Sequence, residues 1–270
     1  MENKSEFLKV AIKAALEAGK ILEKYFETEI LKEFKEDTSI VTLADRESEE
    51  VIKKIILNAF PTHSILGEEM GMAGQESDYV WHVDPVDGTR NFVNGIPIFA
   101  VSIALAYQDK VIIGVVYNPV ARSLFYASKG KGAYLNNKRI FVSKDDKDRA
   151  IITVSPGKLD VEKKLFLELF HDLPNIIRST RNLGCTALEL SYIARGGIEA
   201  NIQLGWSYTY DFAAGTLLVQ EAGGTITMLD GSPWKFPEHH FISSNGVFHN
   251  LLVEEVKKQK AKLNIKQSYE

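Results

Sequence analysis

Apolar residues recur at helical spacing in the first part of the chain. Between residues 5 and 26, positions such as Leu8, Ala11 and Leu22 fall on one face of a helix, which is typical of an amphipathic helix packed against a core. A second pattern of this kind ends near Ile56, and Thr42 stands three residues before Asp45, the spacing of a capping box. We therefore expect two amphipathic helices, the second beginning near Thr42.

Beyond Pro61 the pattern changes to that of strands. From Phe99 to Tyr107 large side chains alternate with Ala and Ser, and small residues on one face let a second layer approach closely. We therefore expect this strand to be covered on both faces. Further strands are predicted at 64–66, 79–83, 111–117 and 124–128, the last two continuing an antiparallel meander, with a hairpin turn at Asn136-Asn137.

A polar run from Ser143 to Arg149 separates this half from one in which strands alternate with helices, the pattern of an α/β unit. In the second half we expect strands at 151–154, 175–178, 200–204, 225–228 and 241–243, and helices at 161–173, 186–194 and 211–222, the last stopped by Gly223-Gly224. We divide the chain into an α+β half (1–145), an α/β half (146–256) and a polar C-terminal tail (257–270).

Composition narrows the class of protein. The 270 residues suffice for one large or two closely packed domains, and 32 Lys and Arg against 36 Asp and Glu leave a net charge of −4, so no overall basic field favours nucleic acid or an anionic membrane. Cys185 has no cysteine to pair with, and the charged start of the chain is unlike a secretory signal. Apolar runs are far shorter than the roughly 20 residues of a membrane span. We expect a cytoplasmic protein without nucleic-acid or membrane partners.

Candidate chemistry is concentrated in short acidic segments. The strand from Trp81 ends in Asp84 and Asp87, and Gly88 and Thr89 follow where a loop is expected to open a helix. Amides at a helix start can hold a phosphate while carboxylates hold hard cations such as Mg²⁺. Taken alone, Asp87-Gly88 is better explained as a simple turn.

Three further acids each have a structural explanation as well. Glu68 follows a predicted strand within Gly67-Glu68-Glu69 and could be a solvated loop charge, Asp211 is expected to begin a helix, and Asp45 fits the capping box. The joint occurrence of these acids carries more weight than any one of them. A Mg²⁺ site needs carboxylates from several segments that meet at one point.

These segments resemble the inositol monophosphatase family, the Mg²⁺-dependent, Li⁺-sensitive phosphatases that include fructose-1,6-bisphosphatases. The matching segments are Val41–Asp45 (V-T-x-x-D), Gly67-Glu68-Glu69 (G-E-E), Asp84–Thr89 (D-P-[IL]-D-G-T), Gly184–Leu190 (G-[ST]-A-A-x-[DE]-[LM]) and Tyr210–Gly215 (W-D-x-A-A-G) followed by Glu221–Gly224. The resemblance runs from about Ser5 to about Asn250. It implies an α+β fold, the layered α-β-α-β-α sandwich, and a homodimer.

The resemblance also implies a set of metal ligands. Glu68, Asp84 and the backbone carbonyl of Val86 would hold the first Mg²⁺, and Asp84, Asp87 and Asp211 the second, with Glu68 helping a weaker third ion. Mn²⁺ is a possible substitute, whereas Li⁺ and Ca²⁺ are expected inhibitors.

Roles in catalysis and substrate binding are implied in the same way. Asp45 and Thr89, with Glu68, would orient and deprotonate the attacking water, and the amides of Gly88 and Thr89 would grip the phosphate. The polyol pocket would be formed by Asp87, Gly184, Cys185, Thr186, Gln203 and Asp211. His82, within a strand, is more simply explained as structural.

Two sequence features bear on the identity of the substrate, and they point in different directions. The segment Arg90–Pro97 is similar to the continuation found in the inositol branch, but Gln203 stands where the inositol phosphatases usually carry a Glu that binds ring hydroxyls. We rank inositol 1-phosphate first and fructose 1,6-bisphosphate, or dual specificity, close behind. Histidinol phosphate remains an alternative. A non-enzymatic alternative is a cation-binding partner of the transcription machinery, although the full set of ligand and water-activating residues favours an enzyme.

Overall fold

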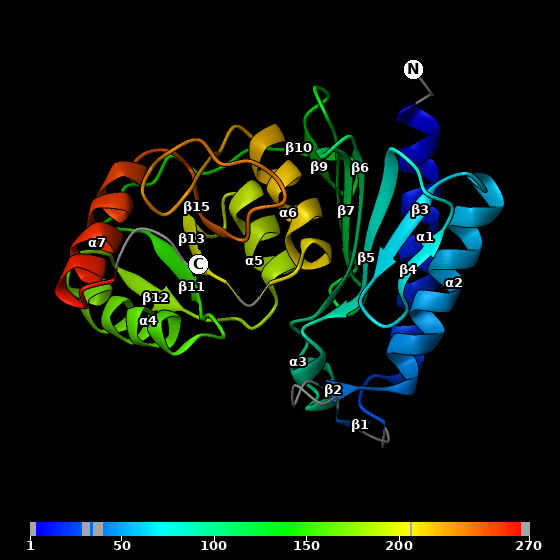
Figure 1. Ribbon diagram of the computed structural model, residues 1–270, viewed down its shortest axis with the longest axis horizontal. Coiled ribbons are helices and arrows are strands. Elements are labelled where there is room, and N and C mark those ends of the chain that lie inside the picture. The colour runs from blue at the N-terminus through cyan, green and yellow to red at the C-terminus, as the bar shows by residue number, and fades with distance from the viewer. Residues whose placement is uncertain (1–3, 29–32, 35–39, 206, 266–270) are drawn as a thin grey trace.

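The computed structural model describes residues 4–28, 33–34, 40–205 and 207–265. Layers of helix and sheet alternate across the molecule: α1 and α2, an eight-stranded sheet, α5 and α6, a five-stranded sheet, and finally α4 and α7 (Figure 1). The expected layered sandwich is confirmed. The helices are α1 Lys4–Tyr25, α2 Leu43–Ala59, α3 Thr89–Val93, α4 Asp160–Asp172, α5 Thr186–Ala194, α6 Thr209–Glu221 and α7 His249–Lys262.

The larger sheet runs in the order β10-β9-β8-β7-β6-β5-β3-β4. Its strands are β3 Ser64–Gly67, β4 Gly71–Gly74, β5 Tyr79–Asp87, β6 Ala100–Tyr107, β7 Lys110–Asn118, β8 Ser123–Ser128, β9 Ala133–Leu135 and β10 Lys138–Ile140. Neighbours are antiparallel except β3 and β5, so the expected meander is present. A small ladder of β1 (Glu33–Phe34) and β2 (Ile40–Val41) lies apart from it.

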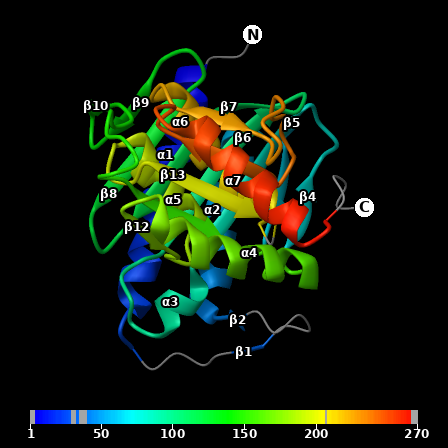
Figure 2. The same cartoon turned by 90° about the vertical axis from the view of Figure 1, so that its left-hand side faces the viewer.

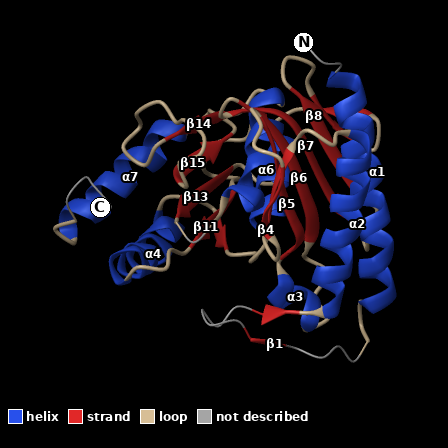
Figure 3. Cartoon of the chain, turned by 45° about the vertical axis from the view of Figure 1, so that its right-hand side comes forward, coloured by secondary structure: helices blue, strands red, loops and turns tan. Residues whose placement is uncertain are grey.

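Both faces of the larger sheet are covered, as the small residues of β6 predict. On one side α1 packs closely, since a Cβ on Gly19 would lie 2.4 Å from the ring of Tyr117 on β7. On the other side α6 approaches β7, where a Cβ on Gly114 would lie 2.7 Å from the backbone oxygen of Ala214. Figure 3 shows α6 between the strands of the two sheets. The second half of the chain therefore supplies a layer that packs on the sheet of the first.

The smaller sheet has the order β12-β11-β13-β15-β14. Its strands are β11 Ile151–Ser155, β12 Ser179–Arg181, β13 Ala200–Leu204, β14 Thr225–Thr227 and β15 His240–Ser244. One expectation was wrong: residues 175–178 are not a strand, because a short 3₁₀ turn at Leu173–Asn175, with Pro174 in it, moves β12 to a later start. Proline fixes the backbone in a helical turn and cannot donate to a sheet.

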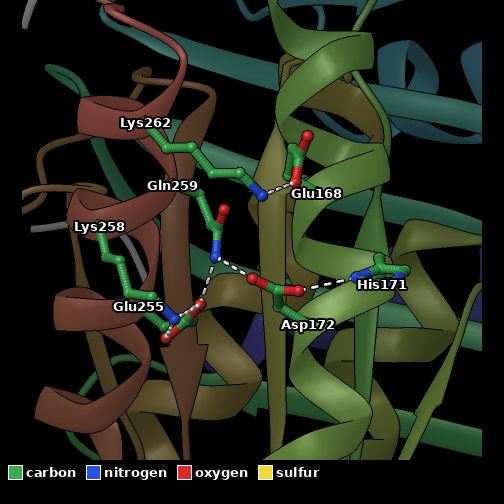
Figure 4. A network of polar contacts seen from close by, with 7 residues as sticks. All are labelled: Glu168, His171, Asp172, Glu255, Lys258, Gln259 and Lys262. Carbon is green, nitrogen blue, oxygen red and sulfur yellow. Dashed lines mark hydrogen bonds and ion pairs between the residues drawn. The ribbon is translucent and has the colours of Figure 1, made fainter.

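The expected polar tail also needs correction. Helix α7 continues to Lys262, well past residue 257, and Gln259 is fully buried. It lies beside α4 on the outer face (Figure 2), where Gln259 donates to Asp172 at 2.6 Å and Lys262 pairs with Glu168 (Figure 4). The first part of α7 packs Leu252 and Val256 into the core, whereas these later contacts are made by polar side chains, which the apolar pattern does not reveal. No helix in the described part of the chain is long and apolar enough to cross a membrane.

Candidate active site

A cavity of about 760 Å³ opens where the end of β5 faces the beginnings of α5 and α6 and the end of β13. Residues from both halves of the chain line it. The predicted site residues that line it are Glu68, Asp84, Val86, Asp87, Gly88, Thr89, Gly184, Cys185, Thr186, Gln203 and Asp211. Asp45 does not line the cavity but lies fully buried behind Thr89.

The end of β5 places two carboxylates on the same side. In a regular strand, residues three apart point to opposite faces of the sheet. The pairing of β5 with β6 shifts register between Asp84 and Asp87, and such an irregularity reorients the side chains that follow it. Asp84 Oδ1 accepts a hydrogen bond from the backbone N–H of Val86 at 2.8 Å, which stabilises this bend.

Gly88 makes the turn from β5 into α3. It has φ of +90°, and a Cβ there would lie 2.8 Å from the backbone oxygen of Ile98, so both its backbone angle and its surroundings require glycine. Asn91 on α3 then donates from Nδ2 to the oxygens of Ile98 and Leu183, each at 2.8 Å. These bonds tie the turn at Gly88 to the loop before α5. The expected helix start at Gly88-Thr89 is therefore present.

Asp45 makes one contact that caps its helix and another with Thr89, which lines the cavity. Its Oδ2 accepts from the backbone N–H of Thr42 at 2.8 Å in the predicted capping box, and its Oδ1 accepts from the Thr89 hydroxyl at 3.4 Å. Thr89 also lies 3.0 Å from the oxygen of Val86. Burial raises the pKa of Asp45 to about 7. The carboxyl therefore holds a proton more readily than an exposed aspartate does.

The second half of the chain provides the opposite wall. Asp211, at the third position of α6, accepts from the backbone N–H of Tyr208 at 2.7 Å, so it caps its helix as well as lining the cavity. Asp87 Oδ2 accepts from the backbone N–H of Ala187, at the start of α5, at 2.5 Å and from Cys185 Sγ at 3.3 Å. The Cys185 side chain is thus buried against Asp87.

Uncompensated negative charge is the main electrostatic property of the cavity. Burial, followed by repulsion from Glu68 and neighbouring aspartates, raises the pKa of Asp84 well above its usual value, and burial raises that of Asp87 to about 7. Repulsion between the Asp84 and Asp211 carboxyl groups contributes to the rise in the pKa of Asp84. A bound cation would relieve it.

The donor set fits a hard divalent cation. Mg²⁺ prefers carboxylate and carbonyl oxygens, and those of Glu68, Asp84, Asp87, Asp211 and Val86 all border this one cavity. Within the described ranges, no three acidic, histidine or cysteine side chains are already gathered around one point.

Stabilisation of the protein by Mg²⁺ should grow with pH. Because the pKa of Asp87, an expected metal ligand, is about 7 in the folded protein against 3.8 for an ordinary aspartate, its burial costs the metal-free fold up to about 1.4 kcal/mol per pH unit between pH 4 and 7. A bound cation removes this cost by favouring the ionised carboxylate. We expect the rise in melting temperature from EDTA to Mg²⁺ to be larger at pH 8 than at pH 5.5.

Comparing Mg²⁺ with EDTA at each pH also controls for other groups that titrate. Buried histidines such as His82, whose pKa burial lowers to about 4, contribute equally with and without the cation and so cancel in the difference. An Mg²⁺ effect that is equal at the two pH values would contradict the assignment of Asp87 to a cation site.

Gln203 offers a ligand fewer hydrogen-bonding groups than its sequence position suggests. Its side-chain amide donates to the oxygen of Gly205 at 2.7 Å and to Ser207 Oγ at 2.8 Å, so both N–H groups are engaged. Its buried Oε1 has no hydrogen-bond partner among the residues that the structure describes. As placed here, Gln203 can accept a hydrogen bond from a ligand hydroxyl but has no N–H left to donate.

Among the cavity residues that were not predicted from the sequence are Lys158 and Tyr208. Lys158, after β11, has its ammonium 3.3 Å from the Tyr208 hydroxyl and 5.2 Å from the centre of that ring, and both residues line the cavity. A lysine and a tyrosine in two loops carry no motif that would identify them. His82, by contrast, does not line the cavity and bonds through Nδ1 to Thr209 Oγ1 at 2.7 Å, in keeping with a structural role.

Known proteins resemble the chain over nearly all of its length. A family model described as the inositol monophosphatase family matches residues 3–261. The fructose-1,6-bisphosphatase/inositol-1-monophosphatase of Aquifex aeolicus is 36% identical, covering 96% of this chain and 98% of its own. The Nus factor SuhB of Pseudomonas aeruginosa is 37% identical, with 88% and 91% covered. A solved IMPase structure from Thermotoga maritima matches with a TM-score of 0.86 at 30% identity, covering 95% and 98%.

Proposed function

The chain belongs to the inositol monophosphatase family, and on that premise we propose that its cavity hydrolyses phosphate monoesters of polyols or sugars, with inositol 1-phosphate as the first candidate. The observation that carries the proposal is that carboxylates from three segments line one cavity beside a helix start. Glu68, Asp84, Asp87 and Asp211 line the same cavity as Gly88 and Thr89. That arrangement suits a phosphate ester held between cations and backbone amides.

The family is metal-dependent, and we assign Mg²⁺ to this cavity. Glu68, Asp84 and the Val86 carbonyl would hold one ion and Asp84, Asp87 and Asp211 another, with Glu68 contributing to a weaker third. When bound, the ions neutralise phosphate charge and make water a stronger nucleophile near neutral pH. Mn²⁺ is the expected substitute, and Li⁺ and Ca²⁺ are the expected inhibitors.

The protein's own groups bind the ester and move the proton. The amides of Gly88 and Thr89 hold the phosphate, and the Thr89 hydroxyl, which bonds to Asp45, orients a water in line with the leaving oxygen. The new bond joins the water oxygen to phosphorus, and Asp45 takes the water's proton by way of Thr89. The bond from phosphorus to the polyol oxygen breaks, and that oxygen leaves as the alcohol after taking a proton from solvent.

A second candidate, fructose 1,6-bisphosphate, is favoured by a specific observation. The positively charged ammonium group of Lys158 belongs to the cavity lining, and it comes from a different segment of the chain than the carboxylates. A second phosphate on the substrate would complement this charge. The Aquifex aeolicus relative also carries both activities in its name. Gln203, with only an acceptor to offer, would contact one substrate hydroxyl in either case.

Phosphate release from a panel of esters tests the proposal. We would measure kcat/KM for inositol 1-phosphate, fructose 1,6-bisphosphate, histidinol phosphate and adenosine 3′,5′-bisphosphate, with Mg²⁺ and with Mg²⁺ plus Li⁺. We expect inositol 1-phosphate to lead and Li⁺ to inhibit. If the bisphosphate leads, and Lys158→Met lowers its kcat/KM at least about tenfold without affecting inositol 1-phosphate, the second candidate replaces the first.

Absence of hydrolysis for every ester would contradict the enzyme assignment. The alternative would then be a cation-binding partner of other proteins, which the name of the Pseudomonas aeruginosa relative, Nus factor, supports. A homodimer, a cytoplasmic location and the division of the chain near residue 146 stay predictions. Sedimentation of the purified protein tests the first of these directly.

A further inference from the structure

Glu49 is a buried carboxylate that the proposed mechanism does not use. It lies one helical turn after Asp45 on α2, and only 1% of it is exposed. Residues four apart share a face of a helix, so α2 directs both acids toward the larger sheet. Glu49 does not line the cavity. Its carboxylate lies beneath the turn that joins β3 to β4, and this turn carries Glu68.

Two contacts fix the carboxylate against that turn. Glu49 Oε1 accepts a hydrogen bond from the backbone N–H of Glu69 at 3.1 Å. A Cβ on Gly67 would lie 1.9 Å from the same oxygen and 2.8 Å from Cδ. Gly67 does not have a positive φ, so glycine is needed here because of the glutamate and not because of the backbone angle.

Glu68 is therefore held from both sides. Its own backbone N–H donates to the oxygen of Val83 at 3.1 Å, one residue before Asp84. The next amide along the chain is held by Glu49. One bond thus ties Glu68 to the strand that carries Asp84, and the other ties it to the helix that carries Asp45.

We propose that Glu49 is a positioning residue, which holds the turn so that the Glu68 carboxylate meets a divalent cation together with Asp84. The proposal rests on the proposed function for the identity of that cation site. Within the described part of the chain, Glu49 Oε2 is buried without a hydrogen-bond partner, so no second hydrogen bond from that oxygen competes with the contact to the turn. A group that orients a metal ligand typically changes metal affinity by about 10- to 100-fold when removed.

Cation binding without substrate is the decisive measurement. Calorimetric titration of Mg²⁺ into wild type, Glu49→Ala and Glu49→Gln gives the dissociation constant of the tightest site. We expect Glu49→Ala to weaken it at least about tenfold and Glu49→Gln, which keeps an acceptor for the Glu69 amide, to recover most of the loss. At saturating Mg²⁺, KM for the best ester should change less than about twofold, because the substrate wall is untouched.

A second pair of variants tests the contact itself. Gly67→Ala should weaken Mg²⁺ binding as much as Glu49→Ala does, because the new methyl group displaces the carboxylate. The double variant should be no worse than either alone, since removing the glutamate removes the clash. Additive losses would mean that the two residues act separately and would remove the proposal.

Glu199→Ala is the matched control. Glu199 is also a buried glutamate, 5% exposed, whose Oε2 accepts from the backbone N–H of Ile151 at 2.7 Å, but it does not line the cavity. We expect it to lower the melting temperature and leave the Mg²⁺ dissociation constant within twofold. If Glu49→Ala behaves in the same way, its role is structural only and the proposal fails.

Failure of the proposed function would look different. A wild-type protein that binds Mg²⁺ but hydrolyses no ester would contradict the phosphatase assignment, while the Glu49 variants would still be judged by calorimetry. A wild-type protein that binds no Mg²⁺ would overturn both proposals.

Discussion

The Asp84→Asn variant is expected to lose phosphatase activity by about a thousandfold or more while it keeps its fold. Asp84 is assigned to both cations, so replacing it with a neutral amide weakens both sites at once. Asparagine has nearly the same shape, and its Oδ1 can still accept from the Val86 amide that Asp84 bonds at 2.8 Å. The variant also removes the charge that the other carboxylates repel. In EDTA it should therefore melt at or above the wild-type temperature.

Measurement of kcat/KM over a range of Mg²⁺ concentrations, together with thermal melting in EDTA, tests this expectation. Asp172→Asn is the control, because Asp172 ends α4, bonds to Gln259 of α7 (Figure 4) and does not line the cavity. It should retain wild-type activity. If Asp84→Asn keeps activity within tenfold of wild type at any Mg²⁺ concentration, Asp84 is not a ligand of an essential cation.

Replacing Gly88 by alanine should have the next largest effect, a loss of at least about a hundredfold in kcat/KM. Gly88 has φ of +90°, and its added Cβ would meet the backbone oxygens of Ile98 at 2.8 Å and Gly184 at 3.2 Å. Neither oxygen belongs to a flexible side chain. The turn must therefore open, which moves the amides of Gly88 and Thr89 away from the position proposed for the phosphate.

Gly95→Ala separates this effect from ordinary backbone strain. Gly95 also has a positive φ, of +70°, but a Cβ there would meet nothing within 4 Å. Both variants thus carry a left-handed alanine, which costs on the order of 1 kcal/mol of stability, while only one forces the turn apart. We expect Gly95→Ala to remain active. Equal activity of the two variants would refute the role given to the turn.

Local sequence patterns were enough for several elements. The strand β6, with its large and small residues alternating and both faces covered, and the capping box of α2 appear in the structure as predicted. Such patterns were not enough where polar contacts or turns determine where a helix or strand begins and ends. The last turns of helix α7 contain lysines, and Gln259 is buried there with hydrogen bonds to Asp172 and Glu255. The strand predicted at 175–178 is displaced by the turn that contains Pro174.

For the site, the sequence revealed the acids but not their arrangement. Whether Asp84 and Asp87 face the same side depends on a register shift between two strands, which a local pattern does not encode. Lys158 reaches the cavity only because two loops meet there. Glu49 looks like an ordinary polar helix position until the turn that carries Glu68 is placed above it. Residues whose role depends on distant partners could not be inferred from spacing.

The caps formed by Asp45 and Asp211 also limit how this protein could change over time. Each acid satisfies a backbone amide at the beginning of its own helix, and losing such a cap typically destabilises a protein by about 1 kcal/mol. A descendant that had abandoned hydrolysis would therefore still be selected to keep both acids in order to fold. Their presence in a relative is weak evidence for catalysis. Glu68, which has no part in a helix cap, is the position where a change would first reveal that the chemistry had been lost.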